Sequence, residues 1–187
     1  MAGLLRPKTA YTLIKKLKKN LNIPIHLHTH STTGLADATN FKAFEAGVDN
    51  IDTSISSFSN LYAHTATESM IAMMYDNRSS PFNNELLTEI SKYFENIRKN
   101  YSKYEGSMKG IDVKMLTNQV PGGMLSILEK QLVDLKKQHK LMDLIKEIPR
   151  IRKDVGYIPL VTPTSQIVGA QACLLYTSDA ADERRRG

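Results

Sequence analysis

Residues 23–34 read IPIHLHTHSTTG, a short apolar stretch that ends in two histidines two positions apart. Side chains at alternate positions of an extended chain lie on the same face, so His28 and His30 are expected to point the same way. Imidazole nitrogen is a ligand for zinc, cobalt, manganese or iron. The motif therefore predicts that His28 and His30 share one divalent ion. The alternative for an isolated His-x-His is a pair of ordinary hydrogen-bonded histidines.

The segments around this stretch alternate between helical and extended patterns. Helices are expected over 7–20, 35–46 and 65–75, and strands over 25–28 and 50–55. Helices that alternate with strands through short connections are typical of parallel βα units. The first part of the chain is therefore predicted to be α/β with parallel strands.

Local signals support these helices. Pro7 suits the first turn of a helix, where its missing N–H has no partner to lose. Gly47 is placed to adopt the left-handed conformation that closes a helix. Thr65 and Glu68 have the spacing of a capping box, which predicts the start of the third helix. The residues of the second helix that are expected to face inward are Leu35, Ala38, Phe41 and Phe44.

The remainder of the chain has a different pattern. Residues 77–84 are rich in Asn, Ser and Pro and are predicted to form a linker. Over 85–172 the apolar residues recur with a helical period, which predicts an all-helical region whose apolar stripes face a core rather than a cofactor. These stripes are Leu86, Leu87, Ile90, Phe94, Ile97 and Tyr101, then Leu125, Leu128, Leu132 and Leu135, then Leu141, Leu144, Ile145 and Ile148.

Composition narrows the function classes. The chain has 187 residues, of which 41% are hydrophobic and 24% charged, as in ordinary globular proteins. No apolar run approaches the roughly 20 residues needed to cross a bilayer, and a signal-peptide core is absent, so a cytoplasmic location is predicted. Cys173 is the only cysteine, so the rest of the chain offers a metal only histidine, carboxylate or modified lysine.

The net charge of +6 raises the question of nucleic-acid binding. Lys15, Lys16, Lys18 and Lys19 form a basic patch, but they lie opposite the apolar stripe of the first helix. No aromatic residues interleave with them, as a platform for single strands would require. No nucleic-acid partner is therefore predicted.

Several motifs occur in a fixed order over residues 1–172. Together they resemble the carboxyltransferase domain of biotin-dependent enzymes, such as the oxaloacetate decarboxylase alpha chain, the carboxyltransferase subunit of two-subunit pyruvate carboxylase and the transcarboxylase core subunit. An ordered series of motifs is more specific than any one of them. The motifs are MAGLLRP (1–7), the histidine stretch, EAGVD (45–49), IDTSIS (51–56), ATES (66–69), NQVPGGMLS (118–126) and GYIPLVTPTSQIVG (156–169).

The resemblance implies a fold and a domain organisation. Residues 1–76 would be the last two βα units of a TIM (β/α)8 barrel, because a complete barrel takes about 250 residues. Residues 77–84 would link them to an all-helical C-terminal extension over 85–172. Six units of the barrel would then lie upstream of this chain.

The last fifteen residues, 173–187, lie outside the resemblance. Their sequence CLLYTSDAADE (173–183) is similar to a translated sequencing adapter, so this tail is predicted to be non-native. The start at Met1 is also suspect, because the motif there continues upstream in the family. The chain is therefore expected to be a fragment of a longer protein.

The resemblance also implies a site. In the family a divalent ion is held by the two histidines that match His28 and His30, together with an upstream aspartate and a carboxylated lysine. Zinc, cobalt or manganese would suit such a site. His26 is expected in the core or behind the ligands. Ser126 aligns with a threonine that moves a proton between pyruvate and biotin; the structural alternative is a residue in the first turn of a helix that Pro-Gly-Gly begins.

The implied activity interconverts oxaloacetate plus biotin with pyruvate plus carboxybiotin. Biotin would be carried on a biotinyl domain outside this chain, and further partners would be a biotin carboxylase or membrane decarboxylase subunits. The parent is expected to be a homo-oligomer. One alternative is another metal-dependent barrel enzyme, such as an acyl-CoA Claisen condensing enzyme or lyase; a second is an inert truncated fragment.

Overall fold

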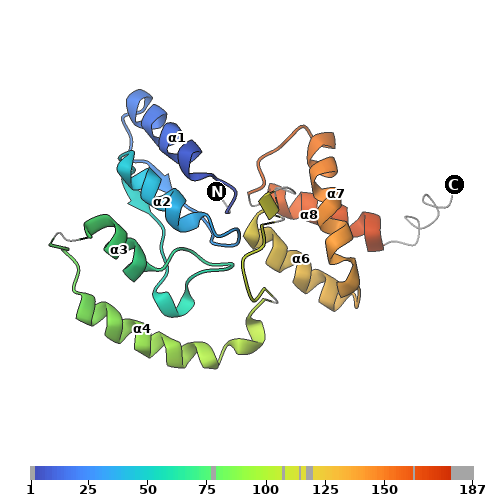
Figure 1. The fold of residues 1–187 in the computed structure, drawn as a ribbon. Coiled ribbons are helices and arrows are strands. Elements are labelled where there is room, and N and C mark those ends of the chain that lie inside the picture. The colour runs from blue at the N-terminus through green and yellow to red at the C-terminus, as the bar shows by residue number, and fades with distance from the viewer. Residues whose placement is uncertain are drawn as a thin grey trace. The chain divides into compact units, whose positions relative to one another are not determined.

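The computed structural model describes residues 3–76, 79–106, 108–113, 115–116, 120–161 and 163–177. They fall into two compact units, residues 1–113 and residues 114–187, and each unit is described by itself. The first unit combines helices with a short parallel sheet, whereas the regular structure described in the second unit is helical (Figure 1). The predictions of an α/β first part and a helical last part are confirmed.

Helix α1 (Pro7–Asn20) coincides with the first predicted helix and begins at a proline. Ala10 and Ile14 are buried, and Leu17 packs against the same core. The four lysines of the basic patch are exposed, and Lys18 Nζ lies 2.8 Å from the Asp49 carboxylate. The patch is therefore the solvated face of an amphipathic helix, as predicted.

Strands β1 (His26–Leu27) and β2 (Asn50–Ile51) pair in parallel, with His26 opposite Asn50 and Leu27 opposite Ile51. Both strands are shorter than the predicted ranges 25–28 and 50–55. Beyond β2, Ser54 forms a parallel bridge with Ala66. The polar side chains of the site begin directly after β1 and β2, at His28 and Asp52.

The core beneath this sheet is small. It contains side chains from the start of the chain, from α1, from the β1 region and from α2 (Ala36–Glu45). The buried apolar residues in it are Leu5, Ala10, Ile14, Ile25, Leu27, Ala43 and Ala46.

Helix α2 buries a different face from the one predicted. Ala38 is exposed and Phe41 is only half-buried, while polar Thr39 and Asn40 are buried. The Thr39 hydroxyl donates a 2.8 Å hydrogen bond to the carbonyl of Leu5. Because these polar groups find partners inside, their burial carries little penalty, and the prediction from apolar side chains alone was wrong.

Helix α3 (Thr67–Tyr75) begins without the predicted capping box. The Thr65 hydroxyl accepts a hydrogen bond from Asn40, and the Glu68 carboxylate accepts hydrogen bonds from the backbone N–H and the hydroxyl of Ser56. Ser56 lies in the short 3₁₀ helix η1 (Ser56–Phe58). The side chains of Thr65 and Glu68 therefore make tertiary contacts and do not cap α3. The prediction for Gly47 is confirmed, since it has φ +89° just after α2.

Helix α4 (Asn84–Lys99) has a well-formed N-terminus, where the Asn83 side chain accepts a 3.0 Å hydrogen bond from the N–H of Leu86. Its predicted apolar stripe is present but is not buried within this unit, and Leu86 is 52% exposed. Phe94 contacts Phe58 of η1. A 3₁₀ helix, η2 (Ser102–Tyr104), follows α4.

The second unit consists of α6 (Gly122–Asp134), the 3₁₀ helix η3 (Gln138–Lys140), α7 (Leu141–Asp154) and α8 (Thr164–Thr177). The predicted stripes of α6 and α7 do face a core, except that Leu135 at the end of α6 is exposed. The buried apolar residues include Leu125, Leu128, Leu132, Leu144, Ile145, Ile148 and Val168.

None of the helices in the described part of the chain is both long enough and apolar enough to span a membrane.

Candidate metal site

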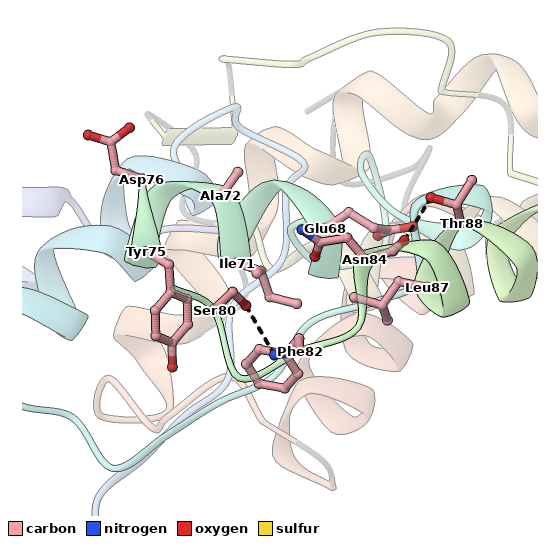
Figure 2. Close-up of a pocket in the computed structure, with 10 residues that line it drawn as sticks. All are labelled: Glu68, Ile71, Ala72, Tyr75, Asp76, Ser80, Phe82, Asn84, Leu87 and Thr88. Atoms are coloured by element: carbon pink, nitrogen blue, oxygen red, sulfur yellow. Dashed lines mark hydrogen bonds between the residues drawn. The ribbon is translucent and has the colours of Figure 1, made fainter. Parts of the chain in front are cut away.

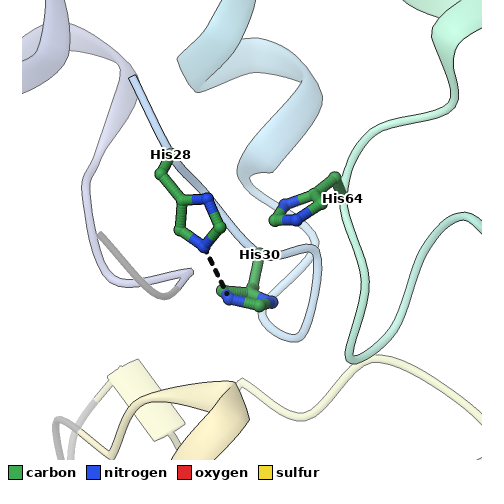
Figure 3. A group of neighbouring side chains, drawn as sticks. All are labelled: His28, His30 and His64. Atoms are coloured by element: carbon green, nitrogen blue, oxygen red, sulfur yellow. Dashed lines mark hydrogen bonds between the residues drawn. The ribbon is translucent and has the colours of Figure 1, made fainter. Parts of the chain in front are cut away.

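Three histidines of the first unit lie together, as Figure 3 shows. His28 and His30 lie just after strand β1, whereas His28 was predicted as the last residue of the strand; His64 lies in the loop before α3. The ring centroids are 5.0 Å apart for His28 and His30, 4.6 Å for His28 and His64, and 4.8 Å for His30 and His64. His64 was not predicted from the sequence.

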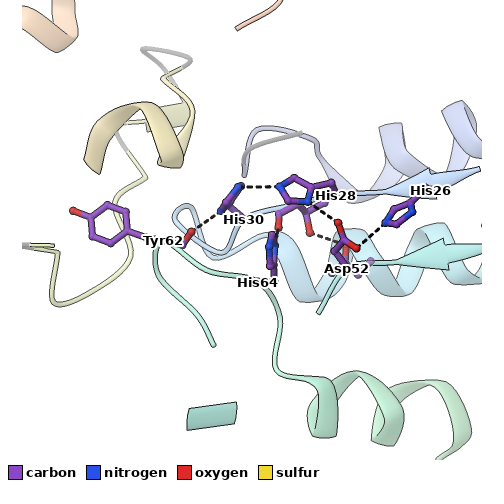
Figure 4. Close-up of polar contacts among 8 residues, drawn as sticks. His26, His28, His30, Asp52, Tyr62 and His64 are labelled. Carbon is purple, nitrogen blue, oxygen red and sulfur yellow. Dashed lines mark hydrogen bonds and ion pairs between the residues drawn. The ribbon is translucent and has the colours of Figure 1, made fainter. Parts of the chain in front are cut away.

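Each of the three rings is held at its Nδ1 atom by an oxygen (Figure 4). His28 Nδ1 lies 2.6 Å from Asp52 Oδ2, His30 Nδ1 lies 2.5 Å from the carbonyl of Tyr62, and His64 Nδ1 bonds to the carbonyl of Thr29. A carbonyl oxygen only accepts hydrogen bonds, as does an ionised carboxylate, so Nδ1 must carry the proton in each ring. In the neutral rings this places the lone pair on Nε2.

The Nε2 atoms of His28 and His30 are 3.2 Å apart. Two nitrogens held about 2.1 Å from one ion lie about 3.0 Å apart at a right angle and about 3.4 Å apart at the tetrahedral angle. Two lone pairs at this separation repel unless a proton or a cation lies between them. The pair therefore has the spacing and the tautomers of two ligands to one metal ion.

The surroundings favour the neutral form of His30 and the ionised form of Asp52. Burial lowers the pKa of His30, and the His64 and His28 rings lower it further, against the opposing effect of the hydrogen bond to Tyr62. The hydrogen bond from His28, and then the one from His26, lower the pKa of Asp52. A neutral imidazole is the form that binds a metal.

Asp52 contacts the candidate ligand His28 at the ring nitrogen that would not face the ion, and His26 contacts Asp52. The Asp52 carboxylate bridges two rings, with 2.6 Å from Oδ1 to His26 Nε2 and 2.6 Å from Oδ2 to His28 Nδ1. A carboxylate in this position fixes the tautomer of a metal-binding histidine and raises its basicity. His26 was expected in the core or behind the ligands; it is exposed, and it reaches the site only through Asp52.

A buried polar network joins the two loops that carry the histidines. The Thr29 hydroxyl donates to Asn40 Oδ1, and Asn40 Nδ2 donates to the Thr65 hydroxyl, each at 2.9 Å. The backbone N–H of Ser31 donates to the carbonyl of Ala63 at 2.8 Å. Residues next to His28, His30 and His64 are thus tied to one another. Asp52, His64 and this network were missed because each depends on contacts between segments far apart in the sequence.

Ser126, the predicted proton-moving residue, is the fifth residue of α6 in the second unit and so lies just after the first turn. Its backbone agrees with the simpler expectation that Pro121 and two glycines begin a helix. Its side chain is outside the described part of the structure, so its role in moving a proton stays a prediction.

A pocket of about 380 Å³ lies elsewhere in the first unit, between α3 and α4 (Figure 2). The hydrogen bond between Ser80 and the N–H of Phe82 shapes its rim. None of the predicted site residues lines it. The residues around it are Glu68, Ile71, Ala72, Tyr75, Asp76, Ser80, Phe82, Asn84, Leu87 and Thr88.

Two family models match the chain. The model described as HMGL-like matches residues 1–94, and the model described as a conserved carboxylase domain matches residues 115–186. The first match contains the three histidines and Asp52, and the second contains Ser126.

Curated relatives are similar over most of this chain. It is 44% identical over 176 residues to the pyruvate carboxylase subunit designated B of Methanocaldococcus jannaschii and 43% identical over 175 residues to the methylmalonyl-CoA carboxyltransferase 5S subunit of Propionibacterium freudenreichii. These alignments include 93% and 92% of this chain but 31% and 34% of the relatives. The chain thus spans about a third of the length of these relatives.

Solved structures are similar as well. The carboxyl transferase domain from Rhizobium etli pyruvate carboxylase matches with a TM-score of 0.88 and 31% identity, covering 96% of this chain and 30% of that domain. The same domain with pyruvate and biocytin matches with a TM-score of 0.89 and 31% identity, over the same shares of the two chains.

Proposed function

This chain belongs to the HMGL-like family, and we propose that it forms part of a metal-dependent, biotin-dependent carboxyltransferase. The family matches bear out the resemblance found in the sequence motifs. The proposed reaction interconverts oxaloacetate plus biotin with pyruvate plus carboxybiotin. The observation that carries the proposal is the pair of Nε2 atoms of His28 and His30, 3.2 Å apart and each set by an oxygen at Nδ1.

The proposed place of the chain in its parent follows the family. Residues 1–76 would be the last two βα units of a TIM (β/α)8 barrel, residues 77–84 a linker, and residues 85–172 the helical extension. The parallel pairing of β1 with β2 across α2 supports the barrel units. Residues 173–187 would be a foreign tail. In a barrel, side chains just after the strands line the active face, where His28 and His30 lie.

His28 and His30 would hold the ion, with an aspartate and a carboxylated lysine from the upstream part of the parent. A borderline divalent cation such as zinc, cobalt or manganese fits this donor set. When bound, the ion would supply positive charge that stabilises the enolate of pyruvate. Asp52 keeps His28 in the tautomer that presents Nε2, and Tyr62 does the same for His30 through its carbonyl.

Ser126 would move the proton between the methyl group of pyruvate and the ring nitrogen of biotin. A hydroxyl suits this task because it donates and accepts at one oxygen. Gly122 and Gly123 let the backbone before it approach a ligand closely. Support for this role comes from the carboxylase match that contains Ser126.

The proposed substrates are pyruvate and oxaloacetate. Partners would be a biotinyl domain and either a biotin carboxylase or membrane decarboxylase subunits, and the parent would be a homo-oligomer. An acyl-CoA condensing enzyme or lyase remains a weaker candidate, because the HMGL-like match alone would suit it but the carboxylase match over residues 115–186 would not.

The proposal is tested in the full-length protein that carries this sequence, by exchange of labelled pyruvate into oxaloacetate in the presence of biotin. We expect His28→Ala and His30→Ala to abolish both the exchange and the bound metal. Exposed His139 provides the matched control, since His139→Ala removes the same side chain from the other unit and not from the histidine cluster. Normal exchange in the His28→Ala and His30→Ala variants would refute the proposal, and acetyl-CoA-dependent condensation without exchange would favour the alternative.

A further inference from the structure

We propose, building on the metal site of the proposed function, that His64 is a third imidazole ligand in this protein. This chain alone would then supply three nitrogen ligands, from His28, His30 and His64, to one divalent transition-metal ion. The three side chains offer nitrogen atoms that all lie within 4.8 Å of one another.

The arrangement of the rings supports three ligands rather than two. The three centroid separations of 5.0, 4.6 and 4.8 Å form a nearly equilateral triangle. A ring bound through Nε2 has its centroid about 3.2 Å from the ion, so rings at 90° to 109° would have centroids about 4.5 to 5.2 Å apart. All three observed separations fall in that interval.

The tautomers of the rings point to the same conclusion. The carbonyl of Thr29 accepts from Nδ1 of His64, just as Asp52 and the carbonyl of Tyr62 accept from the other two rings. All three lone pairs are therefore on Nε2. This pattern of Nδ1 bound to oxygen and Nε2 presented outward is the one that metal-binding histidines show.

The loop that presents His64 is held in place from both sides. The carbonyl of His64 accepts a 2.8 Å hydrogen bond from the N–H of Asn60, and Thr65 is fully buried against Asn40. Asn60 and Leu61 have φ of 66° and 51°, a left-handed conformation that a leucine rarely adopts. Such backbone strain persists where the surroundings fix the loop, and it often accompanies a functional position.

The chemistry of the set indicates the class of ion. Three neutral imidazole ligands suit zinc or cobalt, whereas magnesium and calcium require oxygen ligands. Three histidines on one side of an ion leave coordination positions open for an oxygen ligand. The predicted site is therefore an open, three-nitrogen site.

The test uses the 187-residue chain without an affinity tag, with Zn²⁺ added in calorimetric titration and Co²⁺ followed by its visible absorption. We expect one ion per chain in the wild type. Removal of partners that only orient a ligand lowers metal affinity about 10- to 100-fold, so His64→Ala and His64→Gln should each lower it about 100-fold or more. His139→Ala should leave the affinity unchanged, and far-UV circular dichroism shows whether each variant is folded.

Nitrogen resonances of the histidine rings give a second readout that a merely structural role of His64 would not move. On addition of Zn²⁺, the Nε2 resonances of His28, His30 and His64 should all leave the position of a lone-pair nitrogen. An unmoved His64 Nε2 resonance, or wild-type affinity in folded His64→Ala, would overturn the third ligand while leaving the proposed function intact. Metal bound by all three histidines in a full-length protein that fails to exchange carboxyl groups would refute the proposed function alone.

Discussion

The two units of this chain build their interiors from different groups. In the first unit, polar side chains lie fully buried beside the sheet, and those of Thr29, Asn40 and Thr65 bond to one another. In the second unit, the fully buried side chains are almost all aliphatic. The polar set contains Thr29, Thr32, Thr39, Asn40 and Thr65, and the aliphatic set contains Leu128, Leu132, Leu144, Ile148 and Val168.

This difference matches what each interior has to do. Hydrogen bonds are directional, so the polar network of the first unit fixes the loops that carry the histidines in one geometry. Aliphatic packing is less directional and tolerates rearrangement, which suffices to hold three helices together. The polar interior of the first unit therefore positions the loops that carry the histidines, whereas the aliphatic interior of the second unit stabilises the packing of its helices.

The largest effect is expected from removing an aliphatic group in the second unit. Leu132 on α6 is fully buried, so Leu132→Ala should lower the free energy of unfolding by about 2–5 kcal/mol through lost burial and a residual cavity. Leu135 at the end of the same helix is 50% exposed, so Leu135→Ala should change the free energy of unfolding by about 0.5 kcal/mol or less. Urea unfolding of both variants checks this. Equal effects would contradict the aliphatic core.

Removing a buried polar side chain of the first unit should lower the free energy of unfolding less than Leu132→Ala does, but it should also weaken metal binding. Asn40→Ala removes two hydrogen bonds and leaves the hydroxyls of Thr29 and Thr65 buried without that partner, which should destabilise the first unit by about 1–3 kcal/mol. Because the histidine loops would shift, zinc affinity should also fall.

Exposed Asn96 on α4 provides the control for this change. Asn96→Ala should leave both the unfolding transition and the zinc titration as in the wild type. If Asn40→Ala lowered stability but kept full zinc affinity, the polar network would have no part in positioning the histidines.

The contrast between the units also explains what the sequence could predict. The stripes of α1, α6 and α7 were found because burial of aliphatic residues on one helix face leaves a period in the sequence. The same rule failed for α2, where Thr39 and Asn40 are buried and Ala38 is exposed. Burial that depends on a hydrogen-bond partner from another segment has no local period.

The site follows the same division. His28 and His30 were predicted because two positions of one strand share a face. Asp52 and His64 contact them from segments 24 and about 35 residues away, as the hydrogen bonds of Asp52 with His28 and of His64 with Thr29 show. The position of Asp52 beside His28 could have been predicted only from the parallel pairing of β1 with β2. No local sequence pattern identified His64 as a site residue. Ser126 rests on the motif alone.

Backbone conformation gives a third, smaller comparison within the first unit. Gly47 closes α2 with φ +89°, and a Cβ there would meet no atom within 4 Å, so the cost of Gly47→Ala would be purely conformational. A left-handed alanine is less stable by about 1–2 kcal/mol. Gly110 has equally open surroundings without positive φ, so Gly110→Ala should change the stability little. Thermal unfolding of the two variants measures the difference, and equal melting temperatures would contradict the left-handed turn.

The smallest effect on stability is expected at Asp49, just before strand β2, and it depends on pH. The backbone N–H of Ile25 and then Lys18 lower the pKa of Asp49 below its usual value. A carboxylate with a lowered folded pKa stabilises the protein above its unfolded pKa, and this contribution disappears as the pH falls through the folded pKa. The wild type should therefore melt above Asp49→Asn at pH 7, and the gap should close in strong acid. Lys18→Gln should keep most of that pH dependence, because the hydrogen bond from Ile25 lowers the pKa of Asp49 more than Lys18 does. If Lys18→Gln lost the pH dependence, the exposed ion pair with Lys18 would instead be the main cause of the lowered pKa.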